Sequence, residues 1–259
     1  MSSFSTPAIL LRRIDFSDFD FIINFFTLNH GKFSVIAKNA KKSSKRFSGI
    51  LEPFSFVDLV YNSGRGHGLP VLQEASLKQM FPEIRKNIEK TAYASYWAEL
   101  INTWMEEGQK QKQLFYLFLH MLEGLDVGYM PGANLSILFQ VRFMVISGLH
   151  PNLTSCITCK TEIEGINSST VFFDLGNGGI VCETCGSHSK NHISFSKGTL
   201  KQLLWIQNRS FATASKIRLS HQATQEGLHF LEAFVPYHLG KEPKSLKFLH
   251  QIRKSKKHV

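Results

Sequence analysis

Hydrophobic and polar residues alternate in short runs over the first 80 residues of the chain. Turn-forming residues separate several of these runs, at Asn29-His30-Gly31 and again at Asn62-Ser63-Gly64-Arg65-Gly66. Alternation with a period of two is typical of strands that bury one face. We expect five strands, at residues 8–14, 21–28, 32–37, 54–61 and 69–75. Five short strands in residues 1–80 fit a small closed barrel, and an OB-fold has that strand count.

The spacing of apolar residues lengthens to about four after Phe81, which is typical of helices. Pro82 with Glu83 resembles a helix start. The apolar positions that follow are Ile88, Ala92, Tyr96, Leu100 and Trp104. Further helices are expected at residues 111–122 and 134–147, the second with Asn134 as its N-cap and Gly148 as its C-cap.

A segment that contains all four cysteines interrupts these helices at residues 151–186. Helical spacing resumes at residues 199–208, 221–238 and 245–252, and the basic tail, residues 253–259, is expected to fray. The pattern therefore predicts an α-helical domain over residues 81–259 with an insert of different structure inside it.

The cysteines form two pairs, Cys156-x2-Cys159 and Cys182-x2-Cys185, separated by 22 residues. A two-residue spacer lets one tight turn direct two thiolates at one metal, and two such turns complete a tetrahedron. Between the pairs, residues 171–173 and 180–181 are strand candidates, and Asn177-Gly178 predicts a type I′ turn that brings the two pairs together.

We therefore expect a structural zinc ion bound by Cys156, Cys159, Cys182 and Cys185, because four thiolates leave no open coordination position. Two disulfides, four inert thiols, redox-active pairs and an iron–sulfur cluster remain alternatives, as does a ligand exchange with His188 or His192. The expected fold class is α+β: an N-terminal small β-barrel (OB-fold), followed by an α-helical domain that carries a zinc-binding hairpin insert.

The composition allows a real core, with 43 % hydrophobic residues among 259. No stretch reaches the roughly 18 apolar residues of a membrane span, and the N-terminus lacks the order of a secretory signal. A cytoplasmic protein without a membrane partner is expected.

The net charge of +10 is unevenly distributed along the chain. Residues 1–80 carry a net +4, residues 81–185 a net −4 and residues 186–259 a net +10. Two basic ends around an acidic middle favour a polyanionic partner, with nucleic acid first and an acidic protein or a membrane surface as alternatives.

Motifs of catalysis are absent. The chain has no GxxxxGK[ST] phosphate loop, no HExxH and no GxSxG, and the glycine-rich run at residues 64–68 is expected to be a hairpin loop. Asp15, Asp18 and Asp20 are best explained by a turn between two strands. We predict a protein that is not an enzyme.

A basic segment follows the third expected strand. It contains Lys38, Lys41, Lys42, Lys45 and Arg46, and Arg12 with Arg13 adds two cations in the first strand. Cations placed along a barrel bind a phosphate backbone without regard to sequence. We predict that these seven residues bind DNA. Phe33 and Phe47 flank the segment, and core packing is favoured over base stacking for each.

Several motifs, taken in order, resemble the bacterial recombination mediator family RecO. They are the acidic turn Ile14-Asp15-Phe16-Ser17-Asp18, the element Phe26-Thr27-Leu28-Asn29-His30-Gly31-Lys32, the basic loop Ala37-Lys38-Asn39-Ala40-Lys41-Lys42 and the strand Leu51-Glu52-Pro53-Phe54. Asn39 departs from the glycine of that family, but Asn tolerates a positive φ. Near the end, Tyr237-His238-Leu239-Gly240-Lys241 and Leu246-Lys247-Phe248-Leu249 resemble its closing signature.

The resemblance implies recombinational DNA repair after DNA damage. Members bind single- and double-stranded DNA, anneal complementary strands and help load RecA on DNA coated by single-stranded DNA-binding protein (SSB). It also implies RecR and the acidic SSB C-terminal tail as partners, RecA as an indirect partner, and a cytoplasmic, nucleoid-associated location. A zinc-ribbon accessory factor for RNA or polymerase is the main alternative, and a nuclease is a third.

The C-terminal basic block offers a place for the SSB tail. Lys241, Lys244 and Lys247 are the predicted partner-binding residues, beside apolar side chains of the last two expected helices: Phe230, Leu231, Phe234, Leu246, Phe248 and Leu249. An apolar groove rimmed by cations suits an acidic peptide with a hydrophobic end. A packed helix pair with a solvated basic tail that contacts DNA is the alternative.

Overall fold

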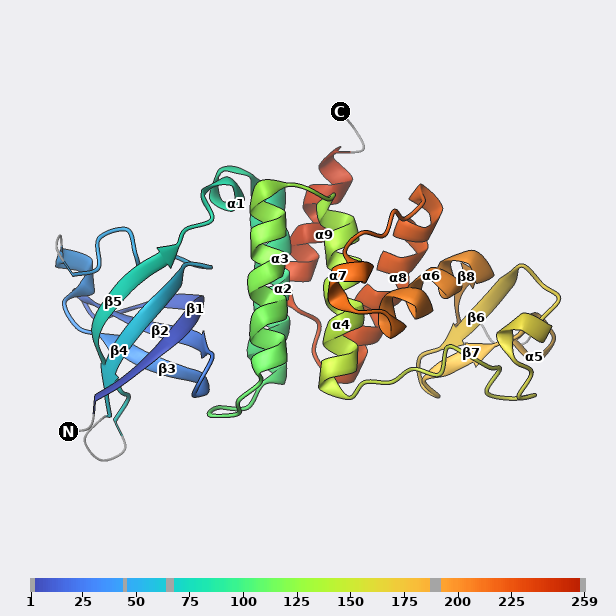
Figure 1. Ribbon diagram of the computed structural model, residues 1–259, viewed down its shortest axis with the longest axis horizontal. Coiled ribbons are helices and arrows are strands. Elements are labelled where there is room, and N and C mark those ends of the chain that lie inside the picture. Colours follow the sequence, from blue (N-terminus) through green and yellow to red (C-terminus); the bar gives the residue numbers. More distant parts are fainter. Residues whose placement is uncertain (1–2, 44–45, 64–67, 187–191, 257–259) are drawn as a thin grey trace. The chain divides into compact units, whose positions relative to one another are not determined.

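The computed structural model describes residues 3–43, 46–63, 68–186 and 192–256. The chain divides into two compact units (Figure 1). One contains Met1–Tyr129 with Pro243–Val259, and the other contains Met130–Glu242. The first unit thus combines the N-terminal sheet with helices from the middle and the end of the chain.

Five strands of the first unit form a closed barrel in the order β1-β2-β3-β5-β4 (Figure 1). They are β1 (Ser3–Phe16), β2 (Asp20–Thr27), β3 (Gly31–Ala37), β4 (Phe56–Asn62) and β5 (Val71–Gln79). All pairs are antiparallel except β3 with β5, which meet at Ile36 and Val71. The barrel interior is filled by alternate residues of the strands, among them Leu10, Phe25, Val35 and Leu59. The predicted strand number and closed barrel are confirmed.

The strand bounds differ from the prediction for local reasons. β1 is longer because its first half pairs with β4 and its second half with β2, with a bulge between Leu10 and Arg12. β4 starts at Phe56, since Phe54 has a positive φ of 70° that no strand residue adopts. The turn predicted from the three aspartates is confirmed between Phe16 and Asp20. The glycine-rich run at residues 64–68 lies mostly outside the described residues.

Four helices complete the first unit: α1 (Pro82–Lys86), α2 (Ile88–Trp104), α3 (Lys112–Val127) and α9 (Lys244–Lys256). The predicted start at Pro82 is confirmed, but the helix breaks at Asn87, whose side chain caps α2 by accepting from the backbone of Glu89 and Lys90. Two carboxylates cap helices from a distance. Asp126 accepts from the first backbone N–H groups of α1, and Glu99 from those of α9.

The expected fraying of residues 253–259 is wrong for its first part, because α9 continues to Lys256. Arg253 explains the extension: its Nε donates to the Tyr93 hydroxyl at 3.1 Å, and its guanidinium lies over the Tyr93 ring. Residues 257–259 lie outside the described part of the chain.

The second unit contains α4 (Gly132–Ser147), α5 (Glu183–Gly186), α6 (Lys197–Asn208), α7 (Phe211–Ala214) and α8 (His221–Leu239). Gly148 ends α4 with a φ of 72°, as predicted. Asn134 is not the N-cap, since α4 begins at Gly132 and the Asn134 side chain accepts from Thr224 of α8.

A three-stranded sheet in the order β7-β6-β8 follows α4 in the second unit. Its strands are β6 (Thr170–Asp174), β7 (Gly179–Val181) and β8 (Ile193–Ser196). The β6–β7 hairpin confirms the prediction, whereas β8 was not anticipated and carries the sheet past the expected end of the insert. Among the described residues, no helix has the length and apolar character needed to cross a lipid bilayer.

Candidate metal centre and nucleic-acid interface

The first cysteine pair lies in a tight turn that is anchored to the hairpin. Cys156 N–H donates to Thr161 O, and Lys160 N–H donates back to Cys156 O, both at 2.9 Å. Lys160 adopts a positive φ of 62°, which turns the chain sharply after Cys159. Ile157 N–H donates to Ile180 O of β7. The first pair is therefore held against the strand that leads to the second pair.

The second pair spans the junction of β7 and α5. Cys185 N–H donates to Cys182 O, and Cys182 N–H donates to the Sγ of Cys156 at 3.4 Å. The β6–β7 loop that delivers this pair is longer than predicted: Asp174 pairs with Gly179, and Gly178 has a φ of 66° while Asn177 does not have a positive φ. A type I′ turn needs both, so that turn type is wrong although the hairpin is right.

The four sulfur atoms lie within 4.8 Å of one another. The Sγ atoms of Cys159 and Cys182 are 3.7 Å apart. Sulfur atoms about 2.3 Å from a tetrahedral zinc are separated by roughly 3.8 Å, so this spacing fits a metal. None of the four cysteines is disulfide-bonded. The cluster can bind a metal ion, and its all-thiolate donor set fits zinc.

Hydrogen bonds shift the pKa values of thiols in this cluster in different directions. The hydroxyl of Thr161 lowers the pKa of Cys159 to about 6, whereas the hydrogen bond with Cys182 raises the pKa of Cys185 to about 12. Burial raises the pKa of the Cys156 thiol. The backbone N–H groups around its sulfur together lower the pKa by more than burial raises it, so the net shift is downward. The site thus stabilises thiolate at some positions before metal arrives, and metal binding would release the remaining protons.

The alternative ligand His192 is placed elsewhere. Its Nε2 lies 3.6 Å from Asp174 Oδ2, and its ring packs near Phe172. The four-cysteine cluster does not include it. His188, the other alternative, lies outside the described residues.

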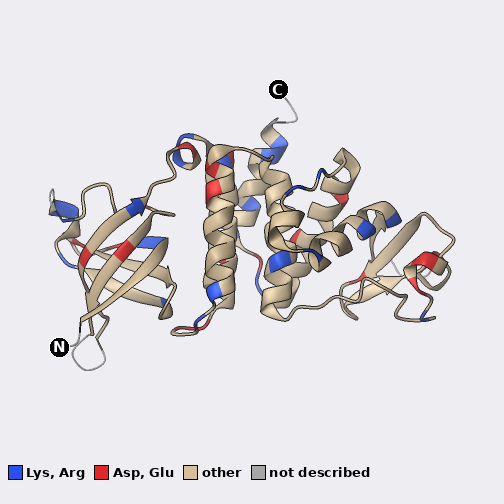
Figure 2. Ribbon diagram, viewed as in Figure 1, with Lys and Arg blue, Asp and Glu red and all other residues tan. Residues whose placement is uncertain are grey.

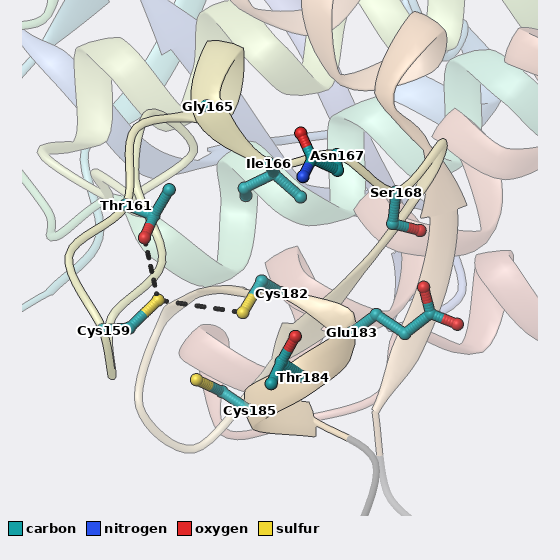
Figure 3. A pocket seen from close by; sticks show the side chains of 10 residues that line it. All are labelled: Cys159, Thr161, Gly165, Ile166, Asn167, Ser168, Cys182, Glu183, Thr184 and Cys185. Carbon is teal, nitrogen blue, oxygen red and sulfur yellow. Dashed lines mark hydrogen bonds between the residues drawn. The ribbon is translucent and has the colours of Figure 1, made fainter.

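A cavity of about 590 Å³ adjoins the cluster. Figure 3 shows the sulfur atoms of Cys159, Cys182 and Cys185 turned toward one space, with the side chains of Thr161 and Thr184 beside them. Cys156 is buried and Cys159 is exposed. The metal centre is therefore open to solvent on the side of Cys159.

The predicted DNA-binding residues Lys38, Lys41, Lys42 and Arg46 are exposed around the short helix η1 (Ala40–Lys42). Asn39 adopts a positive φ of 56°, a conformation that Asn tolerates, and its N–H donates to Asp20. The loop is joined to the β1–β2 turn, since Lys41 N–H donates to Phe19 O at 3.0 Å. Lys45 lies outside the described residues.

Two exposed aromatic residues accompany these cations and were missed by sequence reasoning. Phe16 is 47 % exposed and Phe19 is 38 % exposed. The Nζ of Lys42 lies 3.5 Å from the centre of the Phe19 ring. Phe47 is buried in the barrel core, and Phe33 is partly buried against it, so packing is the role of both, as favoured. The sequence did offer a signal for the exposure of Phe16 and Phe19, since both stand among the polar residues around the turn between β1 and β2. We call Lys38, Lys41, Lys42, Phe16 and Phe19 the barrel-edge surface.

Three of the predicted cations, Arg13, Lys41 and Arg46, already donate hydrogen bonds within the protein. Arg13 donates to Leu51 O and forms an ion pair with Glu52, both at 2.7 Å. Lys41 Nζ donates to Ser17 O at 2.9 Å, and Arg46 donates to Gln73 O at 2.8 Å. These side chains fasten loops to the barrel. Arg12 is exposed.

The motif Thr27 to Lys32 is explained by contacts within the first unit. The Thr27 hydroxyl donates to Gly31 O at 2.7 Å. Lys32 Nζ donates to Asn102 O at the end of α2, and burial lowers the pKa of this lysine. A Cβ on Gly31 would lie 2.3 Å from Gln109 O. This motif packs the barrel on the loop after α2 rather than presenting a cation to solvent.

The predicted partner-binding residues fall in different units, Lys241 in the second and Lys244 with Lys247 in the first. The predicted groove residues are core residues: Phe230, Leu231, Phe234, Leu246 and Leu249 are all at most 1 % exposed. Only Phe248 of that set is exposed, at 40 %. The lining expected for an apolar groove is thus buried, apart from this one ring on α9.

Two family models match the chain: "Recombination protein O N terminal" over residues 1–81 and "Recombination protein O C terminal" over residues 85–247. The DNA repair protein RecO of Desulfosudis oleivorans is 45 % identical over 98 % of this chain and 99 % of its own. That of Desulfatibacillum aliphaticivorans is 44 % identical over 98 % and 99 %. That of Syntrophus aciditrophicus is 32 % identical over 96 % of each chain. With both halves matched and near-complete coverage, this chain belongs to the RecO family of DNA repair proteins.

Proposed function

We propose that this protein is a recombination mediator that binds single- and double-stranded DNA, anneals complementary strands and helps to load RecA on SSB-coated DNA. The observation that carries the proposal is the barrel-edge surface, where exposed Lys38 and Lys42 accompany exposed Phe16 and Phe19. Lys41 of this surface holds its own loop through Ser17 O and Asp15. Cations attract phosphates of any sequence, and exposed aromatic rings stack on unpaired bases. The same combination serves to bring two polyanionic strands together.

The chemistry required is binding rather than bond cleavage. Annealing needs screening of phosphate repulsion, and the barrel-edge surface offers cations without a cluster of carboxylates aimed at a metal. In the described part of the chain, the cysteine set is the one group of His, Cys, Asp and Glu close enough to hold a metal ion. We infer a non-enzymatic protein with one structural zinc, in which Cys156, Cys159, Cys182 and Cys185 bind the metal.

The acidic tail of SSB is the proposed peptide partner, and RecR is the proposed protein partner. Lys244 and Phe248 lie four residues apart on α9 and hence on one helix face, with Lys247 next to them. A cation and an exposed ring suit an acidic peptide with a hydrophobic end. Lys241, the third residue predicted for this partner, belongs to the second unit and is not counted with the residues of α9. RecA would be reached indirectly, and the protein would act in the cytoplasm on the nucleoid.

The proposal is tested by the salt dependence of DNA binding. Lys38→Ala/Lys42→Ala should weaken the binding of a short single-stranded oligonucleotide. The slope of log K against log salt should become less negative by about 1.4, because each phosphate that is no longer neutralised removes about 0.7 from it. Lys110→Ala/Lys112→Ala removes the same charge from an exposed site elsewhere in the first unit and is the matched control. Equal slopes for the parent protein and both variants would refute the barrel-edge surface as the DNA site.

A further inference from the structure

The second unit carries a basic surface of its own. Residues 184–225 contain six Lys or Arg residues and no Asp or Glu. Figure 2 shows blue segments on α6 and along the stretch that follows it. Within this stretch Lys201, Arg209, Lys216 and Arg218 are exposed. We call these four residues the α6–α7 surface. Mixed charge is the ordinary state of a solvated surface, so a one-sign stretch of this length calls for an anionic partner.

Hydrogen bonds within residues 210–217 fix the backbone that carries part of this surface. Ser210 caps α7, with its Oγ accepting from Thr213 N–H. After α7, Lys216 N–H donates to Thr213 O at 3.1 Å, and Ile217 N–H donates to Ala214 O at 3.2 Å. The exposed side chains therefore project from a folded segment, unlike those of a basic tail. A fixed array of cations spends less conformational entropy when it binds a polyanion.

A partly buried arginine lies beneath the segment. Arg142 of α4 donates to Arg209 O, while its Nε is buried without a hydrogen-bond partner. Among the residues that the structure describes, no ion pair involves Arg142. Burial lowers the pKa of its guanidinium, and no carboxylate offsets that effect. A half-buried cation without a counterion is costly, and an anion bound beside it would reduce the cost.

We propose that the α6–α7 surface binds the phosphodiester backbone of a second nucleic-acid strand, on a different compact unit from the barrel-edge surface. A nucleic acid fits better than a lipid surface or a peptide with a hydrophobic end, because no large apolar residue of the described part of 184–225 is exposed. Asn208, Ser210 and Thr213 are exposed and add hydrogen-bonding groups for phosphate oxygens. The inference rests on the proposed annealing function, for which one chain would hold two strands.

The number of oligonucleotides bound per chain tests this surface. The probe is an oligothymidine of about ten nucleotides, a length within the range that one small barrel occupies. The parent protein should bind two per chain at saturation in a sedimentation titration at low salt. Lys216→Ala/Arg218→Ala should bind one, while Lys110→Ala/Lys112→Ala, which loses the same charge, should bind two. Counting per chain removes any ambiguity from self-association.

The barrel double variant separates the two claims. Lys38→Ala/Lys42→Ala should weaken the binding of one of the two oligonucleotides and leave the affinity for the other unchanged. The binding of that other oligonucleotide should depend on Lys216 and Arg218. A parent protein that binds no DNA would refute the proposed function itself. A parent that binds one oligonucleotide per chain, or a Lys216→Ala/Arg218→Ala variant that still binds two, would overturn the α6–α7 surface alone. The proposal for the α6–α7 surface would also be overturned if either double variant lost both oligonucleotides while its thermal unfolding stayed unchanged, since the two surfaces would then not be independent.

Discussion

At the scale of single residues, the shared motifs of this chain serve packing as often as binding. Arg13 was predicted to bind DNA, yet it pairs with Glu52, and Lys32 of the Phe26–Lys32 motif donates to the end of α2. Both partners lie far away in sequence, 39 and 70 residues respectively. A pattern of charges cannot reveal such partners, because they depend on how distant segments fold together.

Gly31 provides a prediction at this scale. Gly31→Ala should lower the free energy of unfolding by about 2–4 kcal/mol, because the residue has a positive φ and its new Cβ would clash with Gln109 O. Gly49→Ala is the matched control, with a similar φ of 69° but no atom within 4 Å of the added Cβ, and should cost about 1 kcal/mol. Urea denaturation measures both, and equal losses would show that the packing on Gln109 is unimportant.

At the scale of elements, the sequence predicted regular structure well and turns less well. Apolar periodicity located the barrel strands and the long helices to within a few residues. It missed α5, β8 and α7, which are four residues each and too short to show a period. The cysteine spacing predicted the ligand cluster, since local turns alone bring each pair together. The exposed rings of Phe16 and Phe19 were missed because burial depends on the completed barrel.

The junction of β8, α6 and α8 yields a pH prediction. Glu226 of α8 accepts from the backbone N–H and the hydroxyl of Ser196, both at 2.9 Å, and from the hydroxyl of Thr199. Burial raises the pKa of this carboxyl. The hydrogen bonds together lower the pKa by more than burial raises it, so the pKa of Glu226 is below its usual value. Glu226→Gln should reduce the free energy of unfolding at pH 7 by about 1–3 kcal/mol.

The sign of the pH dependence follows from that direction. Because the folded pKa is lower than the unfolded one, the unfolded chain takes up the proton first as pH falls. The stabilisation is therefore complete above the unfolded value near 4.5 and is lost as pH falls through the folded value. The gap between parent and Glu226→Gln should close in acid. Glu164→Gln, at an exposed site, should show no gap at any pH, and a gap for Glu226→Gln that stays constant as the pH is lowered from about 7 into the acid range would contradict the assignment.

The metal centre yields a prediction for the β6–β7 hairpin. Purified protein should contain about one zinc per chain, and Cys182→Ser should lose the metal and unfold at a lower temperature, since metal free energy is folding free energy. The defect should be confined to the second unit, so binding at the barrel-edge surface should persist. Elemental analysis and thermal unfolding measure both effects. Folded, metal-free protein with the stability of the parent would rule out a structural zinc.

At the scale of the whole molecule, the chain combines a DNA-repair family identity with basic surfaces on two compact units. The barrel-edge surface joins cations to exposed rings, which suits unpaired bases. The α6–α7 surface has cations and hydroxyls without exposed apolar residues in its described part, which suits a backbone alone. A protein with two such surfaces can hold two strands without cutting either. Four thiolates would fill the coordination sphere of a zinc ion, so a zinc bound at the cysteine cluster would have a structural role and no part in the chemistry of DNA.

The most direct measurement is strand annealing on SSB-coated DNA. Two complementary oligonucleotides with donor and acceptor dyes are coated with SSB and mixed with the protein in Mg²⁺, and energy transfer is followed over time. The account predicts that the parent protein and Lys110→Ala/Lys112→Ala accelerate annealing, that Lys38→Ala/Lys42→Ala is at least about tenfold slower because fewer phosphates are neutralised, and that every strand keeps its full length on a denaturing gel. Annealing no faster than that of the oligonucleotides with SSB alone, or strands shortened by cleavage, would contradict the assignment of this chain as a non-enzymatic annealing protein.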